Sequence, residues 1–127
     1  MTVKKKIRYS EEELKEFEGI INEKLHKVRE DLKELKISIA KISLNASKLN
    51  KVEESVEVEA REYLNSLAAR QYKFMLHLER ALERIKIGTY GICVVTGQLI
   101  EKERLYAVPH TTHSLAAKKN RPLPTLS

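Results

Sequence analysis

The sequence has little of what disulfide or metal stabilisation requires. Its 127 residues include one cysteine and no tryptophan, and aromatic residues make up only 6% of the chain. A single cysteine excludes an internal disulfide, and no N-terminal apolar run resembles a signal peptide or a membrane span, so we expect a reducing, cytoplasmic location. With 33% charged residues, the composition is typical of long exposed helices rather than of a thick globule.

The net charge of +6 belongs to the ends of the chain. Seven bases lie in the two tails, and the body without them carries about −1: Lys4, Lys5, Lys6, Arg8, Lys118, Lys119 and Arg121. A DNA-binding module would use such tails as phosphate contacts, but the body has no basic face and no evident reading helix. An enzyme is disfavoured as well, because the cysteine has no evident base beside it and no glycine-rich phosphate loop is present.

Two long amphipathic helices are predicted. Ser10 precedes three glutamates, with Glu13 at the capping-box position, so the first helix is expected to begin here. Apolar residues then recur every seventh position in two stripes: Leu14, Ile21, Val28, Leu35 and Ile42, and Leu25, Leu32 and Ile39. A second run has the same period: Ala60, Leu67, Phe74 and Ala81, and Leu64, Leu78 and Ile85. Each run needs a partner for its apolar stripe, which predicts an antiparallel coiled-coil hairpin.

The turn of this hairpin is expected within "LNASKLNKVEES", Leu44 to Ser55, where residues that favour turns and caps replace the heptad pattern. Negative charge is concentrated just after it, in Glu53, Glu54, Glu57 and Glu59. Acids are favourable at any helix N-terminus, so their presence does not by itself identify a binding site.

A small knob is predicted after Gly88, which can take the left-handed conformation that ends a helix. Gln98 to Glu101 and Arg104 to Val108 are expected to form a short β-hairpin, and Thr112 to cap a last helix over His113 to Asn120. The predicted fold is therefore mainly α, a long coiled-coil hairpin with a small knob. Its segments are a basic lead-in (1–9), the hairpin (10–87, tip near 45–55), the knob (88–120) and a tail (121–127).

The knob carries a resemblance to a known family. "RIKIGTYGIC", followed by Gly97, Ile100, "RLYA" (Arg104 to Ala107) and Pro109, resembles the signature of the DksA/TraR family of bacterial transcription regulators. That family normally carries a four-cysteine zinc site, whose ligand positions fall here at Cys93, Thr96, Ser114 and Ala117. Because neither alanine nor a neutral hydroxyl is a zinc ligand, we predict that the site is degenerate and that no cofactor is bound.

Two further readings of the knob stay open. Cys93, His110 and His113 would make a three-ligand zinc site, although no fourth group is evident and two surface histidines are the simpler interpretation. Without metal, Thr96 is expected to hydrogen-bond within the turn, and a small apolar core is predicted from Val94, Val95, Leu99, Ile100, Leu105 and Leu115.

The resemblance implies a function. Family members bind RNA polymerase, insert the coiled coil into the secondary channel and alter the stability of promoter complexes, often with guanosine tetraphosphate, a link to the stringent response. The family's acidic tip pattern falls at Asn50, Glu53 and Ser55, and a small shift would place Glu54, Glu57 or Glu59 there. Positions near the nucleotide fall at Arg70, His77 and Lys118. We expect neither a membrane partner nor direct sequence-specific DNA binding. The alternative is a coiled-coil adaptor or self-associating hairpin without transcriptional activity.

Overall fold

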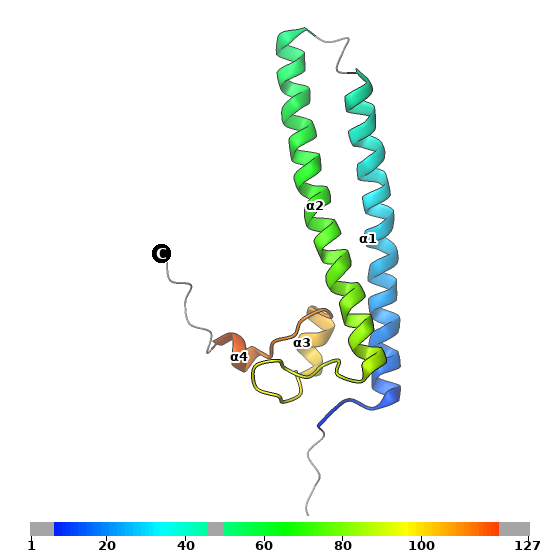
Figure 1. Ribbon diagram of the computed structural model, residues 1–127, viewed down its shortest axis with the longest axis vertical. Helices are drawn as coiled ribbons and strands as arrows, with labels where there is room; N and C mark the ends of the chain where they lie inside the picture. The colour runs from blue at the N-terminus through cyan, green and yellow to red at the C-terminus, as the bar shows by residue number, and fades with distance from the viewer. Residues whose placement is uncertain (1–6, 46–49, 120–127) are drawn as a thin grey trace, which may run out of the picture. The chain divides into compact units, whose positions relative to one another are not determined.

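The computed structural model describes residues 7–45 and 50–119 and is mainly helical (Figure 1). Two long helices, α1 (Glu11–Asn45) and α2 (Lys51–Ile87), are followed by two short ones, α3 (Lys102–Ala107) and α4 (Leu115–Lys119). The chain divides into two compact units. We call Glu23–His77 the hairpin unit, and the remainder, described over residues 7–22 and 78–119, the knob unit. The predicted class, mainly α with a long helical hairpin, is confirmed.

Helix α1 begins where its capping signal predicts. The backbone N–H of Glu13 donates to Ser10 Oγ at 3.2 Å, and the backbone N–H of Ser10 donates to Glu13 Oε1 at 3.1 Å. These reciprocal bonds form a capping box, which satisfies two backbone donors that the first turn would otherwise leave without partners.

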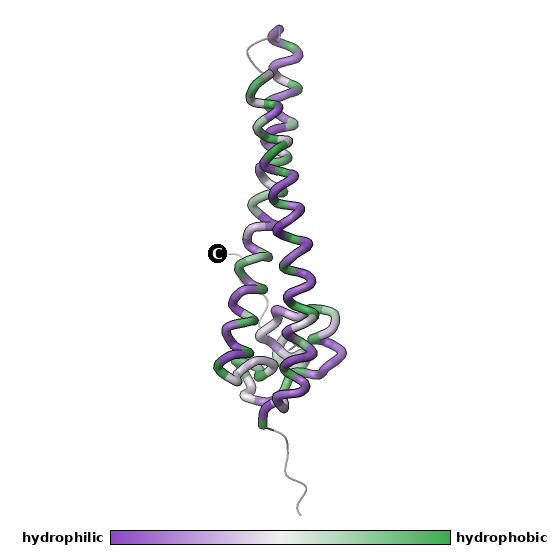
Figure 2. The backbone as a smooth tube through the Cα atoms, turned by 90° about the vertical axis from the view of Figure 1, so that its right-hand side faces the viewer, coloured by the Kyte–Doolittle hydropathy of each residue, from purple (hydrophilic) through white to green (hydrophobic). Residues whose placement is uncertain are grey.

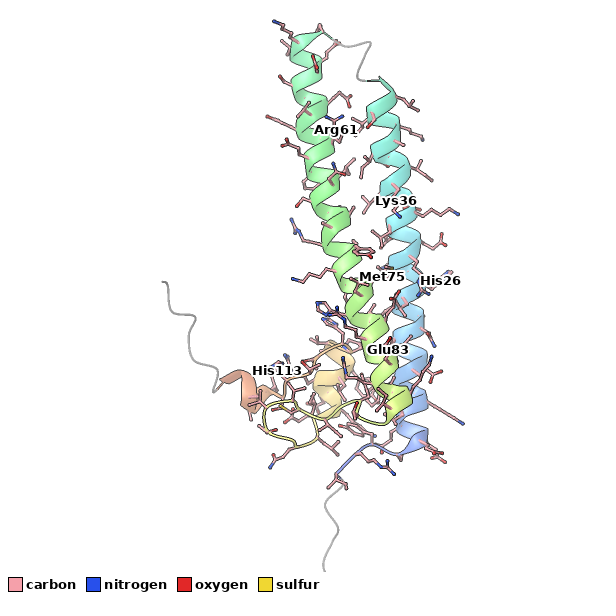
Figure 3. All side chains as sticks on the ribbon, in the orientation of Figure 1. His26, Lys36, Arg61, Met75, Glu83 and His113 are labelled. Carbon is pink, nitrogen blue, oxygen red and sulfur yellow. The ribbon has the colours of Figure 1, made fainter. Side chains whose placement is uncertain are left out.

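In the hairpin unit the two helices lie side by side, with Met75 of α2 pointing towards α1 (Figures 1 and 3). The predicted stripe of α1 is buried at Leu25, Val28 and Leu32, which confirms the heptad reading there. Burial declines towards the end of α1, since Leu35 and Ile39 are only half-buried. Among residues 51–77 of α2, all of them described, none is buried. The hairpin unit therefore buries its apolar stripes incompletely.

Helix α2 has a capping box of its own. The backbone N–H of Glu53 donates to Asn50 Oδ1 at 2.9 Å, and that of Asn50 donates to Glu53 Oε2 at 3.3 Å. Residues 51–55 of the predicted tip are therefore helical, and Asn45 is the last residue of α1. Residues 46–49, the remaining part of that prediction, lie outside the described residues, as do residues 1–6 of the lead-in and the predicted tail at 121–127.

The knob unit is built around aromatic rings. Phe17 of α1 is fully buried, and its ring centroid lies 5.7 Å from that of Tyr9, 5.4 Å from that of Tyr90 and 5.3 Å from that of Tyr106. Aliphatic side chains from α1, α2 and the knob complete this core: Leu14, Ile21, Leu78, Ala81, Ile85, Ile100 and Leu105. Burial on this scale is the main source of the unit's stability.

The predicted core of the knob is therefore only partly correct. Ile100 and Leu105 are fully buried and Leu99 is half-buried, but Val94, Val95 and Leu115 are exposed. The valines lie in the turn that follows Cys93, where the backbone bonds of the turn leave their side chains facing solvent. Tyrosine and phenylalanine rings fill the space that we assigned to aliphatic side chains.

The predicted β-hairpin of the knob is wrong. Within the described residues, pairing is limited to an isolated antiparallel bridge between Ile92 and Leu99, and the second expected strand is helix α3. Lys102 and Tyr106 share one face of α3 because four residues separate them, and both contact α1. Lys102 Nζ lies 2.7 Å from Glu13 Oε2, and Tyr106 donates its hydroxyl hydrogen to Glu16 Oε1 at 2.6 Å. Leu105, one residue earlier, is buried in the core.

The last predicted helix is shorter than expected and has a different cap. Helix α4 begins at Leu115, and the backbone N–H of Ala117 donates to Ser114 Oγ at 3.2 Å. Ser114 therefore takes the capping role that we assigned to Thr112, whose hydroxyl lies 3.0 Å from His113 Nδ1. The predicted end at Asn120 lies outside the described residues.

Candidate functional site

The turn that leads from α2 into the knob is shaped by two glycines. Gly88 has a φ of 91°, and its N–H and that of Thr89 both donate to the carbonyl of Arg84, at 2.8 and 2.9 Å. This left-handed residue ends α2 as predicted. Gly91 has a φ of 81°, and a Cβ placed there would lie 2.5 Å from the Tyr9 ring. Gly91 is thus required both for its conformation and for the close approach of Tyr9.

Tyr9 and Tyr90 bind backbone carbonyls within the knob through their hydroxyl groups. Tyr9 donates to the carbonyl of Ile100, and Tyr90 donates to the carbonyl of Pro109 at 2.8 Å. Burial raises the pKa of both phenols, so both remain protonated donors at neutral pH. Arg84 also holds this region, because it donates to the carbonyl of His110 at 3.2 Å.

Cys93 lies in the next turn and is almost fully buried. Its Sγ accepts backbone N–H hydrogens from Thr96 at 3.5 Å and from Ser114 at 3.4 Å. Burial alone would raise the pKa of the thiol, but hydrogen bonds from Thr96 and Ser114 outweigh it and lower the pKa to about 6. The cysteine is therefore polarised towards the thiolate inside a closed turn.

Hydrogen bonds link the four positions that the resemblance assigns to a zinc site. Thr96 and Ser114 contact Cys93 Sγ through their backbones, and Ala117 bonds to Ser114. The Thr96 hydroxyl accepts the N–H of Gln98 at 3.3 Å, so it hydrogen-bonds within the turn as predicted. One thiol, two hydroxyls committed to backbone bonds and a methyl group do not fit zinc, which needs four thiolate, imidazole or carboxylate ligands.

The three-ligand alternative finds no support in the geometry. Among the residues that the structure describes, no group of three or more His, Cys, Asp or Glu side chains is placed to hold a metal ion. His113 is exposed on the segment that precedes α4, and its carbonyl accepts a hydrogen bond from Arg104 at 3.3 Å (Figure 3). Cys93, His110 and His113 therefore do not form a site in the described part of the chain.

Zinc can be built back into this turn as a test. The variant Thr96→Cys/Ser114→Cys/Ala117→Cys is expected to bind one zinc ion, because its four thiols would meet where the present hydroxyls and methyl group lie. Its melting temperature should then fall on chelation, whereas that of the wild type should stay within about 1 °C. Metal content by mass spectrometry and thermal scans with and without chelator measure both effects. A chelator-sensitive wild type would contradict our prediction that this chain binds no cofactor.

The acidic positions of the hairpin tip occupy the first three turns of α2. Glu53 is engaged in the capping box with Asn50, whereas Glu54 and Ser55 are exposed and Glu57 is half-buried. Glu54 and Ser55 line a surface hollow together with Lys51, Val58 and Glu59. The sequence analysis missed the capping role of Glu53, although an asparagine followed three residues later by a glutamate is a capping-box pattern.

Of the three positions that the resemblance links to the nucleotide, two lie on the same helix face. Arg70 and His77 share one face of α2 because seven residues separate them, and Arg70 is exposed while His77 is half-buried. Lys118 belongs to α4 in the knob unit, and its side chain lies outside the described residues. A common site for these three residues stays a prediction.

These features define a hairpin unit of two long helices and, in the knob unit, a glycine-rich turn and two short helices around an aromatic core. The chain is similar in structure to the transcription factor DksA2 from Pseudomonas aeruginosa, with a TM-score of 0.78 and 22% identity over 84% of this chain and 80% of that one. The fold is therefore that of DksA2, as the resemblance of the knob sequence predicts.

The sequence comparisons match shorter segments of the chain than the structural comparison does. General stress protein 16O of Bacillus subtilis is 49% identical over 41 residues, which span 32% of this chain and 25% of that protein. An uncharacterized protein of Aquifex aeolicus is 38% identical over 52 residues, which span 41% of this chain and 36% of that protein. No protein-family model matches the chain. None of the described helices is both long and apolar enough to span a membrane.

Proposed function

We propose that this protein is a transcription regulator that binds RNA polymerase, inserts its hairpin into the secondary channel of the polymerase and modulates the stability of promoter complexes. The observation that carries the proposal is the fold shared with the transcription factor DksA2 over 84% of the chain. The sequence "RIKIGTYGIC" supports it independently, because it resembles the family signature and includes the turn that follows α2.

The charge of the hairpin unit is compatible with this role. Between residues 51 and 63, α2 carries five glutamates and only two bases, Lys51 and Arg61. We expect this pair of helices to enter the channel, where the charge of its acidic end would act on metal ions or basic groups. Glu54 is the strongest candidate for such contact, because it is exposed and not used for capping.

Independence from zinc is part of the proposal. The knob is held by packed rings and by the hydroxyl bonds of Tyr9 and Tyr90, none of which needs a metal. The regulator would then keep working under zinc scarcity. Guanosine tetraphosphate remains a proposed ligand at the polymerase interface, with Arg70, His77 and Lys118 as the positions that would face it.

The test separates charge from helix capping. Glu53→Gln keeps an oxygen that can accept the Asn50 N–H, so it removes charge while preserving the capping box. We expect Glu53→Gln/Glu54→Gln to bind RNA polymerase from the same organism within about twofold of wild type but to lose about tenfold of its effect on promoter-complex lifetime. Binding is measured by surface plasmon resonance, and lifetime by competitor challenge.

Glu34→Gln is the matched control, since it removes one exposed glutamate from α1 in the same unit. It should leave both binding and complex lifetime unchanged. A wild-type protein that does not bind polymerase at all would refute the proposal and leave likeness of fold alone. A double variant as active as wild type would show that Glu53 and Glu54 are not the working groups.

A further inference from the structure

A row of basic side chains runs along one flank of α1 in the hairpin unit. Arg29, Lys33 and Lys36 are all exposed. At about 100° per residue they fall within about 60° around the helix axis, and at about 1.5 Å per residue they span about 10 Å along it. We call these three residues the basic row. Figure 2 shows hydrophilic positions recurring between the apolar ones along both helices of this unit.

The acids of α1 in the hairpin unit lie outside this row. Glu30 is the nearest, about 60° around the axis from Lys33, and the other acids lie further round: Glu23, Asp31 and Glu34. Within the described residues, neither Lys33 nor Lys36 forms an ion pair. The expectation that the body of the chain has no basic face is therefore wrong, because its small net charge is the sum of faces that differ in charge.

Arg61 of α2 lies on the same side of the seam as the basic row. It directly follows the seam residue Ala60, as Lys36 directly follows Leu35. In an antiparallel pair of helices, equivalent heptad positions beside the seam flank it on the same side. Arg61 is half-buried, and Figure 3 shows it in the same part of the hairpin unit as Lys36. Bases therefore flank this side of the seam from both helices.

An exposed aromatic ring borders the same side of the seam. Tyr72 is 53% exposed. It lies one helical turn before Met75, which directly follows the seam residue Phe74 and so belongs to this side. Figure 3 shows Met75 at the height of His26 along the hairpin unit. Because α2 runs antiparallel to α1, Tyr72 lies opposite the start of the basic row.

This combination suits a single-stranded nucleic acid better than a protein surface. A protein interface has an apolar core, but Tyr72 is the only large apolar side chain exposed on this side of the seam in the described part of the unit. The others lie behind α1 or across the seam: Ile37, Leu44, Val52, Val56 and Tyr63. Single strands are bound by bases that follow the sugar–phosphate backbone and by aromatic rings on which nucleobases stack. Both kinds of group are present here.

We propose that this side of the hairpin unit binds single-stranded nucleic acid, with the basic row and Arg61 along the sugar–phosphate backbone and Tyr72 stacked on a nucleobase. Such binding is independent of base sequence, because the phosphates are alike and every nucleobase has a face for stacking. RNA and DNA single strands share this chemistry. The binding does not rest on the proposed action on polymerase.

Fluorescence anisotropy with labelled oligouridine and oligothymidine of about 12 nucleotides measures the binding, at about 50 mM salt and above. Lys33→Gln/Lys36→Gln should raise Kd at least about fivefold and make the slope of log affinity against log salt shallower by about 1.4, since two phosphate contacts are lost. Lys27→Gln/Lys41→Gln is the matched control, because it removes the same charge from exposed positions of α1 outside the row. It should change Kd by less than about twofold.

Tyr72 distinguishes a single strand from other polyanions. Tyr72→Ala should raise Kd about fivefold or more, whereas Tyr72→Phe keeps the ring and should stay near wild type. Tyr63→Ala removes a ring that is 65% exposed across the seam and should leave Kd unchanged.

Four results would overturn the proposal. The first is a wild type without measurable binding to either oligonucleotide up to about 100 μM. The second is an equal loss of affinity in the lysine variant and its matched control, because net charge alone would then account for the binding. The third is an unchanged Kd in Tyr72→Ala. The fourth is binding of polyglutamate as tight as that of oligouridine, which would point to an acidic protein partner instead.

Discussion

Replacing Gly91 with alanine is expected to lower the free energy of unfolding by about 2 to 4 kcal/mol. Two costs combine at this position. The backbone φ of 81° is unfavourable for any residue with a side chain, and the new Cβ would lie 2.5 Å from two atoms of the Tyr9 ring. That ring cannot move away freely, because it packs on Phe17 and its hydroxyl is bonded to the carbonyl of Ile100. Urea unfolding followed by circular dichroism measures the loss.

Gly97 provides the control for the backbone term. Its φ of 71° is similar, but a Cβ there would meet no atom within 4 Å. Gly97→Ala should therefore cost about 1 kcal/mol, from conformation alone. In the background Tyr9→Ala, the further cost of Gly91→Ala should shrink towards the same value, because the clash is gone. Equal losses for Gly91→Ala and Gly97→Ala in the wild-type background would show that the Tyr9 ring yields, contrary to our account.

The helices were predictable because their signals are local. The capping box of Ser10 and Glu13 needs only four consecutive residues, and the buried Leu25 and Leu32 follow from a period read along one segment. The same kind of signal marks the start of α2 at Asn50 and Glu53, where we recognised turn residues but not the box. Four consecutive residues would therefore have been enough to predict the start of α2 as well.

Helix α3 was mistaken for a strand because its partners are distant in the sequence. Tyr106 bonds to Glu16, 90 residues away, and Lys102 pairs with Glu13 of the same helix. A short apolar segment before a proline is compatible with either a strand or a single helical stretch, and tertiary contacts decide between them. No periodicity in so short a segment could have shown this.

Around Cys93, the sequence indicated which residues lie near one another but not the part that each plays, and the loss of zinc there stays a prediction. The resemblance named Cys93, Thr96, Ser114 and Ala117, and the structure brings these residues together through hydrogen bonds. It did not predict that Ser114 would cap α4. The aromatic core was missed because Phe17 lies outside both of the heptad series that we traced, although its spacing from Leu14 and Ile21 is helical.

Phe17→Ala is expected to lower the free energy of unfolding by about 3 to 5 kcal/mol. Phe17 is fully buried, and it is the ring that the other three share, since each of Tyr9, Tyr90 and Tyr106 lies within 5.7 Å of it between centroids. Its removal leaves a cavity in the unit that we propose to fold without zinc. Urea unfolding measures the loss, and the near-ultraviolet circular dichroism of the tyrosines should weaken in the folded variant.

Two variants establish what the ring itself contributes. Phe17→Leu keeps most of the volume but loses the ring pairs, so it should cost about 1 to 2 kcal/mol. Phe74→Ala removes a half-buried ring from the hairpin unit and should cost less than Phe17→Ala, because less surface is lost from the core. If Phe17→Ala were no more destabilising than Phe74→Ala, packing around Phe17 would not be what holds the knob, and another source of stability, including a bound metal, would have to be sought. The expected order, with Phe17→Ala well above both others, would instead show that packing around Phe17 holds the knob unit.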